Sequence, residues 1–337
     1  MSTTDWKRRL LKLGFREHPR PGRRNPSGLA VIYGSVAAPK LGRIKTISST
    51  GFYMPTEDRW PVGEVIPMTL QRDGMPENVS PFKIDLQVRV ASHGSDGVGL
   101  GFVLPTGMDP DLWEVLVRDA DIKMETNHVS FLFRLVRTVL FLCRLCPSGA
   151  QEAIHLLGGE LDESRTKSAI EIALSAEKHI AGEPNGDNMR AHPQIVADIL
   201  KDGSWSNDDL IQQLWAGLLA SCCTLDGLDE SNRRFIELLT QVTEIQARIL
   251  VAGCRRSNEP GSGITGKPPQ EIIIMPEEMI QITGITDLYR NATDLSYLFN
   301  FGLLNKVFDF TTYLPKDNFN ITPSSLGLEL YKVCRGR

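Results

Sequence analysis

The stretch "GRIKTISSTGFYMP", residues 42–55, contains two short runs rich in β-branched and aromatic residues, separated by a turn that ends in glycine. Residues of these types favour strands, and glycine at the end of a turn permits a close reversal of the chain. The stretch predicts two strands, 42–48 and 51–55, joined by a Ser-x-x-Gly turn.

Similar runs lie on both sides of this stretch. They are "LAVIYGSV" (29–36), "EVIPMTLQR" (64–72), "FKIDLQVRVASH" (82–93) and "GVGLGFVL" (97–104), each bounded by Gly, Pro or polar residues. So many short strands in so short a segment predict a small antiparallel β-barrel. The segment 108–120, "MDPDLWEVLVRDA", is predicted to be a helix that closes the barrel.

The chain changes character at about residue 125, where apolar residues begin to recur with the helical period of 3.6. The fold class is therefore multidomain, with a β-barrel followed by an all-α part and a winged-helix-like C-terminus. Helices are predicted at 129–146, 164–181, 193–201, 207–223, 230–256 and 276–282. The predicted domains are a basic N-terminal helix or arm (1–15), the barrel with its closing helix (16–120), a helical bundle (121–256), a linker (257–270) and a C-terminal helical unit (271–337).

Basic residues are concentrated at the start of the chain. The formal net charge of the 337 residues is -4, yet residues 1–24 hold eight Lys or Arg against two acidic residues. A basic arm on an acidic body indicates a small anionic ligand, an anionic surface or association of the arm with the body. The overall charge argues against general nucleic-acid binding.

Three features favour a cytoplasmic protein. The start "MSTTDWKRRL" has no apolar core typical of a signal peptide, and the six cysteines follow no disulfide framework. The most apolar segment, 129–146, carries three arginines within one arc of the helix, so no transmembrane segment is expected. It predicts an amphipathic helix whose apolar face is buried, or which lies on a membrane surface or a partner.

The arginine-rich arm and the turn have a spacing that resembles a known module. Arg20 and Arg24 form an R-x-x-x-R pair, and Ser48 and Gly51 form the turn "TISSTG" of residues 46–51. Over residues 16–107 this pattern resembles a PilZ domain, the bacterial receptor for cyclic di-GMP. Guanidinium groups match phosphate oxygens and the guanine edge. The resemblance implies cyclic di-GMP as the ligand and Arg20, Arg23, Arg24, Thr46, Ser48 and Gly51 as the residues that bind it.

One position departs from the PilZ pattern. Thr46 stands where the family has Asp or Asn, and its hydroxyl is shorter and uncharged. Two hypotheses follow. In the first, cyclic di-GMP binding changes how the helical part meets a protein partner or itself. In the second, the domain no longer binds ligand, and the protein is an oligomerising scaffold of the kind that phage defence would require.

The helical part also resembles a family. "WAGLLA" begins at Trp215, a second apolar helix begins near Phe235, and "GLL" from Gly302 precedes "ITPSSLG" from Ile321. Together, over roughly 130–337, these segments resemble the Abi-alpha family of bacterial abortive infection. Most of the matching residues are of packing type, so the resemblance concerns the fold and implies no catalytic residue.

Other motifs fit common chemistries poorly, and we expect no enzyme activity, no cofactor and no metal site. "GSGITGKP" (261–268) has Pro268 where a phosphate-binding loop needs Ser or Thr. "CRLC" (143–146) lacks a second cysteine pair at zinc spacing. The histidines show no paired metal-ligand spacing.

Overall fold

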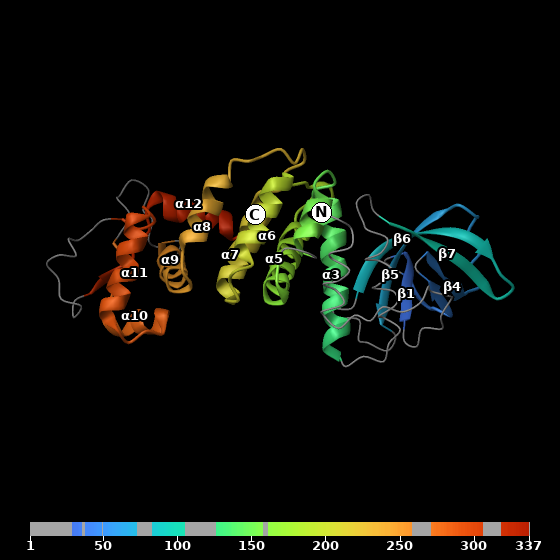
Figure 1. Cartoon of the computed structure of the whole chain (residues 1–337), viewed down its shortest axis with the longest axis horizontal. Coiled ribbons are helices and arrows are strands. Elements are labelled where there is room, and N and C mark those ends of the chain that lie inside the picture. Colours follow the sequence, from blue (N-terminus) through green and yellow to red (C-terminus); the bar gives the residue numbers. More distant parts are fainter. Residues whose placement is uncertain are drawn as a thin grey trace. The chain divides into compact units, whose positions relative to one another are not determined.

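The computed structural model describes residues 29–35, 38–48, 50–72, 83–104, 126–157, 161–257, 271–305 and 318–336 (Figure 1). The chain divides into two compact units, Met1–Ile170 and Glu171–Arg337. The predicted helices at the N-terminus and at 108–120 lie outside the described residues. The predicted domain boundaries stay predictions.

The described part of the first unit contains a seven-stranded antiparallel sheet. Its strands are β1 (Leu29–Ser35), β2 (Ala38–Arg43), β3 (Thr46–Ser48), β4 (Gly51–Pro55), β5 (Val65–Arg72), β6 (Lys83–His93) and β7 (Gly97–Val103). Their order across the sheet is β2-β1-β5-β6-β7-β4-β3. The predicted strands are confirmed, with one change: the run 42–48 is divided between the end of β2, which begins earlier at Ala38, and β3.

The sheet curls so that its two outermost strands meet. Only Ile44 and Lys45 separate β2 from β3, although the two strands stand at opposite ends of the strand order. The Ile44 N–H donates to Leu29 O, at the start of β1, and the Lys45 N–H donates to Tyr53 O on β4. One nearly continuous segment is thus bonded first to one end of the sheet and then to the other, which gives the barrel-like form that the sequence predicts.

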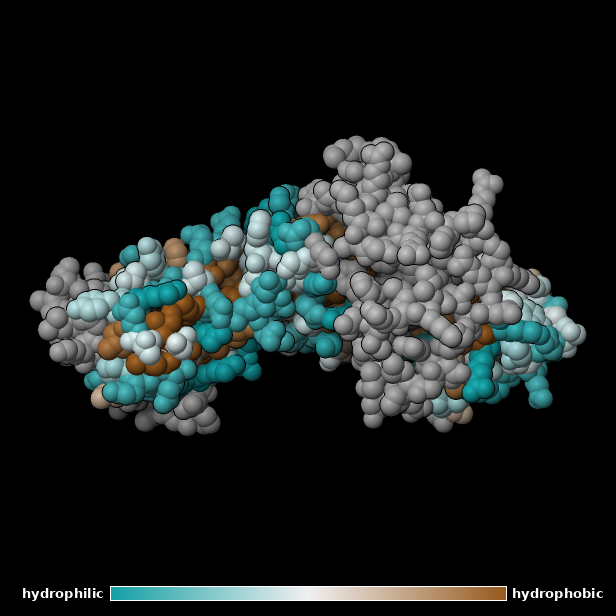
Figure 2. All heavy atoms as spheres, turned by 60° about the horizontal axis from the view of Figure 1, so that its bottom comes forward, coloured by the Kyte–Doolittle hydropathy of each residue, from teal (hydrophilic) through white to brown (hydrophobic). Residues whose placement is uncertain are grey.

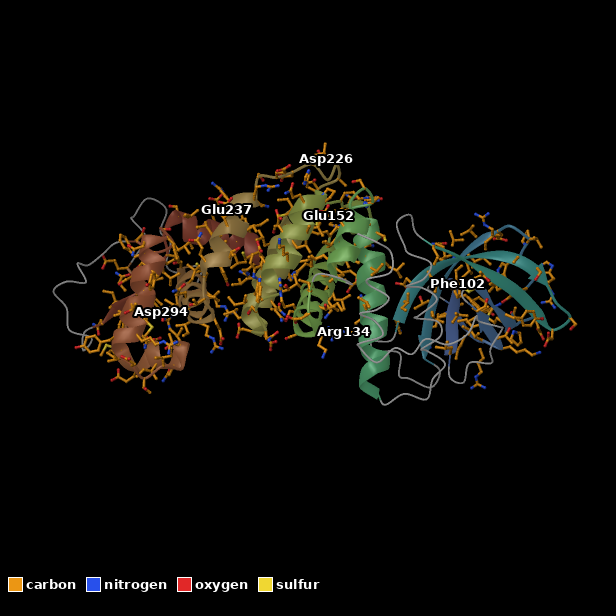
Figure 3. All side chains as sticks on the ribbon, viewed as in Figure 1. Phe102, Arg134, Glu152, Asp226, Glu237 and Asp294 are labelled. Carbon is orange, nitrogen blue, oxygen red and sulfur yellow. The ribbon has the colours of Figure 1, made fainter. Side chains whose placement is uncertain are left out.

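Alternate residues of the strands fill the inside of the curled sheet. Val31, Leu70, Ile84 and Val88 are buried at 1% exposure or less. Figure 3 labels Phe102 on β7, whose ring centroid lies 5.6 Å from that of Phe52. Burying such side chains contributes roughly 1.5 to 3 kcal/mol each. This interior fixes which side chains point outward.

In the described part of the first unit the sheet is followed by α3 (Thr126–Leu145) and α4 (Ala150–His155). Of the side chains that can be described on α3, Leu135, Val139 and Leu142 are buried, whereas Arg137 and Arg144 are partly exposed. This supports burial of the apolar face of the predicted amphipathic helix. Among the described helices, none combines the length and the apolar character needed to cross a bilayer.

The second unit is helical. After α5 (Glu163–Ala181), which spans the division between the units, come the 3-10 turn η3 (Gly186–Asn188), α6 (Pro193–Gly203), α7 (Asp209–Ser221), α8 (Arg233–Gln241) and α9 (Glu244–Ser257). Helix α7 contacts α6, α8, α9 and α12. Asp208 caps its N-terminus by accepting from the Ile211 N–H at 3.0 Å. Nine of its thirteen residues are buried, so α7 is the core helix of the unit.

The single helix predicted at 230–256 is wrong, because the chain forms α8 and α9 with a break between them. The Thr243 N–H donates to Gln246 Oε1 at 3.1 Å, and Thr243 Oγ1 accepts from the Gln246 N–H at 3.4 Å. This reciprocal capping box starts a new helix at α9. The buried Gln246 amide also donates to Asp294 of α11 at 3.0 Å, and Asp294 is labelled in Figure 3.

The last elements are β8 (Ile273–Ile274), α10 (Pro276–Thr283), α11 (Leu288–Asn300), β9 (Phe319–Asn320) and α12 (Ser325–Cys334). They include three helices, α10, α11 and α12, that pack against α9. Strands β8 and β9 pair as a short antiparallel ribbon. The predicted helices near 276–282 and at "ITPSSLGLELY" are confirmed as α10 and α12. The winged-helix assignment stays a prediction.

Large hydrophobic side chains reach the surface of the second unit. Figure 2 shows them in the region where α10 and α11 lie in Figure 1. Ile273, Met275, Tyr289 and Tyr297 are each about half exposed or more, and Tyr297 stacks on Phe301 with ring centroids 6.4 Å apart. Exposed hydrophobic surface of this kind is a feature of association sites.

Candidate functional site

The turn between β3 and β4 is held by the hydroxyl of Ser48. Ser48 Oγ donates to Gly51 O at 3.0 Å and lies 3.2 Å from Thr50 Oγ1. Ser48 and Gly51 face each other as the closing pair of the hairpin. Because the hydroxyl proton is used within the turn, the lone pairs of Ser48 Oγ are what it can offer to a ligand, which must then donate the hydrogen bond.

Gly51 is needed for a close approach between strands. A Cβ at this position would overlap the Leu100 carbonyl oxygen of β7 and lie 2.9 Å from Gly101 Cα. Gly51 is not among the described glycines with positive φ. The backbone conformation of the turn therefore does not require a glycine at this position, contrary to expectation. The glycine lets β4 lie flat against β7.

Two rows of paired residues run across the outer face of the sheet. One row consists of Ser48, Gly51, Gly101 and Arg89, and it crosses β3, β4, β7 and β6. Directly opposed residues project to the same face of a sheet, and the members of this row are all exposed or half-exposed.

The second row consists of Thr46, Tyr53, Gly99 and Ser92. We call Gly51, Gly99 and Gly101 the glycine strip. At Gly101 a Cβ would meet no atom closer than Thr50 O at 3.6 Å, so the backbone there is open to a ligand. Gly99 itself is buried, and a Cβ there would lie 2.7 Å from Ser92 Oγ, so the open backbone of the strip is at Gly101, bordered by hydroxyl groups, a tyrosine and an arginine.

Arg89 is a site residue that the sequence did not single out. It stands opposite Gly101, is exposed, and makes no hydrogen bond or ion pair with another described side chain. An unpaired guanidinium beside a bare stretch of backbone can bind a phosphate or the edge of a guanine. Its only sequence signal is its place in an alternating strand next to the "GVGLG" run.

Tyr53, Asp96 and Lys45 form a second group that sequence reasoning missed. The Tyr53 hydroxyl donates to Asp96 at 2.6 Å, and Lys45 Nζ lies 2.8 Å from the same carboxylate. The hydrogen bonds from Lys45 and Tyr53 lower the pKa of Asp96 to about 2, and the bonds to Asp96 raise the pKa values of Lys45 and Tyr53. The Tyr53 ring is therefore fixed beside the glycine strip, with Lys45 Nζ over the ring at 5.9 Å from its centroid.

Of the predicted ligand-binding residues, Thr46 lies in the described part of the chain and the three arginines do not. Thr46 lies on β3 opposite Tyr53, is half-buried, and makes no side-chain hydrogen bond within the described part of the chain. Arg20, Arg23 and Arg24 lie outside the described residues. The structure thus brings Thr46, Ser48 and Gly51 together on one hairpin, and the arginines' part in the site stays a prediction.

The remaining sequence signals do not form a second centre of chemistry. Cys143 and Cys146 are buried, and burial raises the pKa of Cys143 to about 11 and of Cys146 to about 12. Thiolates are the reactive and metal-binding form, so burial disfavours both roles. Within the described ranges no group of three or more His, Cys, Asp or Glu side chains is arranged to hold a metal. The "GSGITGKP" segment lies outside them.

The residues that carry the resemblance of the helical part have packing positions. Trp215, Leu218 and Leu219 on α7 and Phe235 on α8 are each at most 2% exposed. The "ITPSSLG" segment contributes the buried Ile321. These residues position helices and supply no exposed chemistry.

Comparison with known proteins supports the family resemblance of the helical part. A family model described as "Abortive infection alpha" matches residues 163–334, just over half of the chain. The first unit gives no PilZ family match. No curated protein matches the chain.

Proposed function

Because the chain belongs to the abortive infection alpha family, we propose that it acts in bacterial defence as a cyclic di-GMP receptor and not as an enzyme. The curled sheet of the first unit is the receptor and the helical unit is the output. Ligand binding alters how the helical unit meets a protein partner or another copy of itself. In this proposal the signal is passed on by a protein–protein contact of the helical unit.

The observation that carries this proposal is the Ser48–Gly51 turn beside the open backbone at Gly101 and the unpaired Arg89. A guanine base is planar and can approach backbone closely only where side chains are absent. Its N1–H and its exocyclic N2 amino group are donors for the lone pairs of Ser48 Oγ, and its O6 and N7 atoms accept from arginine.

The arm completes the proposed site. Arg20, Arg23 and Arg24 precede β1, which is bonded to the β2–β3 segment through Ile44 and Leu29. Each charged hydrogen bond from an arginine contributes roughly 1.5 to 3 kcal/mol. A few of them reach micromolar affinity, about 8 kcal/mol. In this proposal an arginine such as Arg89 supplements the arm, and the Asp96 carboxylate holds Tyr53, the residue paired with Thr46.

We expect calorimetric titration to detect saturable cyclic di-GMP binding to the full chain, with a loss of ten-fold or more in affinity in Arg24→Ala. Gly101→Val should also lose binding, because its side chain covers the open backbone while a strand tolerates valine. Thermal unfolding of each variant checks that the fold is kept.

Arg43→Gln is the matched control, since this exposed arginine lies on β2, outside the two rows of the site. It removes one positive charge, as Arg24→Ala does, and should leave affinity unchanged. Absence of binding to the wild-type chain at high micromolar ligand would contradict the receptor proposal.

A second candidate function is that of an oligomerising scaffold. It is favoured by Thr46 in place of Asp or Asn and by the exposed hydrophobic side chains of the helical unit, among them Trp205, Leu228 and Tyr289. In this case light scattering should give an oligomer whose mass does not respond to cyclic di-GMP, and Tyr289→Ser or Leu228→Ser should reduce its mass. A monomer at all concentrations would exclude it.

A further inference from the structure

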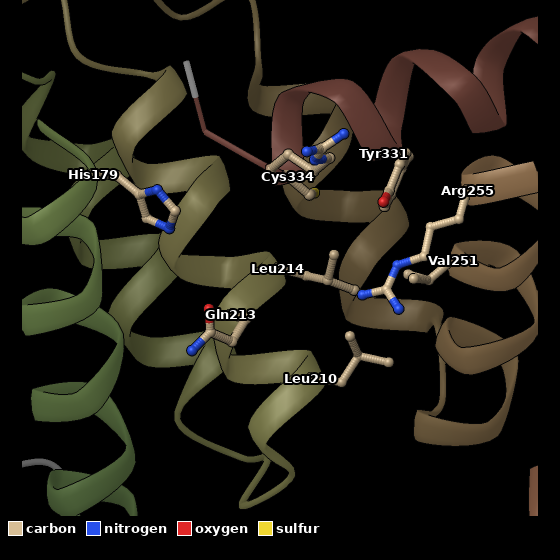
Figure 4. Close-up of a pocket in the computed structure, with 9 residues that line it drawn as sticks. His179, Leu210, Gln213, Leu214, Val251, Arg255, Tyr331 and Cys334 are labelled. Atoms are coloured by element: carbon tan, nitrogen blue, oxygen red, sulfur yellow. The ribbon is translucent and has the colours of Figure 1, made fainter. Parts of the chain in front are cut away.

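The helical unit contains a pocket that neither the PilZ resemblance nor the family match assigns. It has a volume of about 320 Å³ and is lined from four helices, α5, α7, α9 and α12. Figure 4 shows Arg255 reaching from α9 toward Leu214 of α7, with His179 and Gln213 across from it. Ligand pockets begin at about 300 Å³, so a small organic molecule fits.

The arginines of α9 differ in how their charge is balanced. Arg248 pairs with both Glu244 and Asp208, and Arg256 pairs with Glu278. Arg255 lies between them in sequence and lines the pocket, yet it has no acidic partner within the described part of the chain. Two arginines of the helix are thus paired with carboxylates, whereas the one that lines the pocket is not.

The other polar groups of the pocket are also donors. Arg335 extends from the end of α12, with its guanidinium over the Tyr331 ring at 5.6 Å from the centroid. His179 and Gln213 add an imidazole and an amide, and the residues that line the pocket include no Asp or Glu. A cavity with two guanidinium groups and no carboxylate favours an anion.

The floor of the pocket is apolar. Leu214, Val251 and Tyr331 are at most 8% exposed and present carbon atoms to the cavity. The pocket shares Leu210, Val251 and Arg255 with a neighbouring hollow of about 620 Å³, whose lining also includes Asp208 and Asp209. The carboxylates therefore lie in the neighbouring hollow, and Arg255 stands at the boundary, beside the apolar floor of the pocket that has none.

We infer that this pocket binds a small phosphorylated molecule with a planar, partly apolar body, the chemistry of a mononucleotide. Arg255 and Arg335 hold the phosphate, because a guanidinium fork matches two phosphate oxygens. The base lies on Leu214 and Val251, and the Gln213 amide can both donate to its edge and accept from it. The site does not depend on the proposed receptor function, since it shares no residue with the glycine strip.

The test is calorimetric titration of the full chain with AMP and GMP, and with inorganic phosphate and adenosine as partial probes. We expect at least one nucleotide to bind, with affinity at least ten-fold above that of phosphate or adenosine alone. Arg255→Gln and Arg335→Gln should each weaken nucleotide binding by about ten-fold or more. Both residues are exposed, so both variants should fold.

Arg290→Gln is the matched control. It makes the same change in charge on an exposed residue of α11 that does not line the pocket, and its affinity should equal that of the wild type. The inference is overturned if neither nucleotide binds at millimolar concentration, if phosphate alone binds as tightly, or if the two pocket variants bind like Arg290→Gln. Titration with cyclic di-GMP distinguishes the two proposals, because Arg255→Gln leaves the glycine strip intact.

Discussion

Gly217→Ala should destabilise the helical unit by about 3 kcal/mol. A Cβ at Gly217 on α7 would overlap the Cys334 carbonyl of α12 and lie 2.8 Å from the Gly336 backbone nitrogen. Because these obstacles are backbone atoms, no side-chain rotation relieves the overlap and the helices must separate. Alanine improves helix propensity by about 1 kcal/mol, which is too little to compensate.

The same separation would disturb a second contact between these helices. Ser221 Oγ of α7 donates to Val333 O of α12 at 2.6 Å, which satisfies a carbonyl in the last turn of α12. Thermal unfolding followed by circular dichroism at 222 nm, where helices dominate the signal, should give a midpoint lower by roughly 6 to 12 °C.

Gly182→Ala is the control for this experiment. It is the same substitution in the same unit, but its Cβ would meet His179 O at an ordinary 3.5 Å. Its unfolding midpoint should stay near that of the wild type. If Gly217→Ala unfolds at the wild-type temperature, α7 and α12 do not pack as closely as described.

The second large effect is expected for Gly51→Ala, which should weaken the pairing of β4 with β7 by roughly 2 to 3 kcal/mol. The added methyl group would overlap the Leu100 carbonyl, next to the terminal Gly51–Gly101 pair of the β4–β7 ladder. Hydrogen exchange measured by mass spectrometry should show faster exchange in peptides covering 46–55 and 97–103, with peptides of β1 and β5 less affected.

Gly101→Ala is the control for this experiment. It introduces an alanine into the same row of residues without the overlap with the β7 backbone that Gly51→Ala produces. Gly101 is paired directly with Gly51, but its Cβ would make only ordinary contacts, with Thr50 O at 3.6 Å and Arg89 O at 3.8 Å. Exchange in this variant should match the wild type. Equal exchange in Gly51→Ala and Gly101→Ala would mean that the fit of β4 against β7 does not depend on the glycine.

Strands and helices were predictable where their buried residues follow a regular period. Strands β5, β6 and β7 alternate or carry apolar runs, and their predicted and observed bounds differ by about a residue. The start of β2 was missed because residues 38–41 are all exposed, so nothing in their pattern indicates a buried face. The break before α9 was missed because the apolar period continues across Val242, and only the Thr243 capping box marks it.

The candidate site was predictable only in part. Ser48 and Gly51 were found from a local motif, but Arg89 and Tyr53 enter the site through strand register, which one sequence does not determine. The pocket of the helical unit was not predicted, since His179, Gln213, Arg255 and Arg335 lie on four helices far apart in the chain. Such sites depend on tertiary packing, and each residue alone looks like an ordinary surface position.

The two-residue junction between β2 and β3 has a consequence for how the sheet stays curled. Ile44 and Lys45 act as a tether that keeps the two outer strands close, so little chain entropy is lost when the sheet curls. A flexible insertion between them would leave the β1–β2 and β3–β4 ladders intact while releasing this tether. The sheet could then open toward a flat ribbon with two free edges, a shape that pairs readily with other chains. We therefore expect the short junction to disfavour pairing of these edges with other chains.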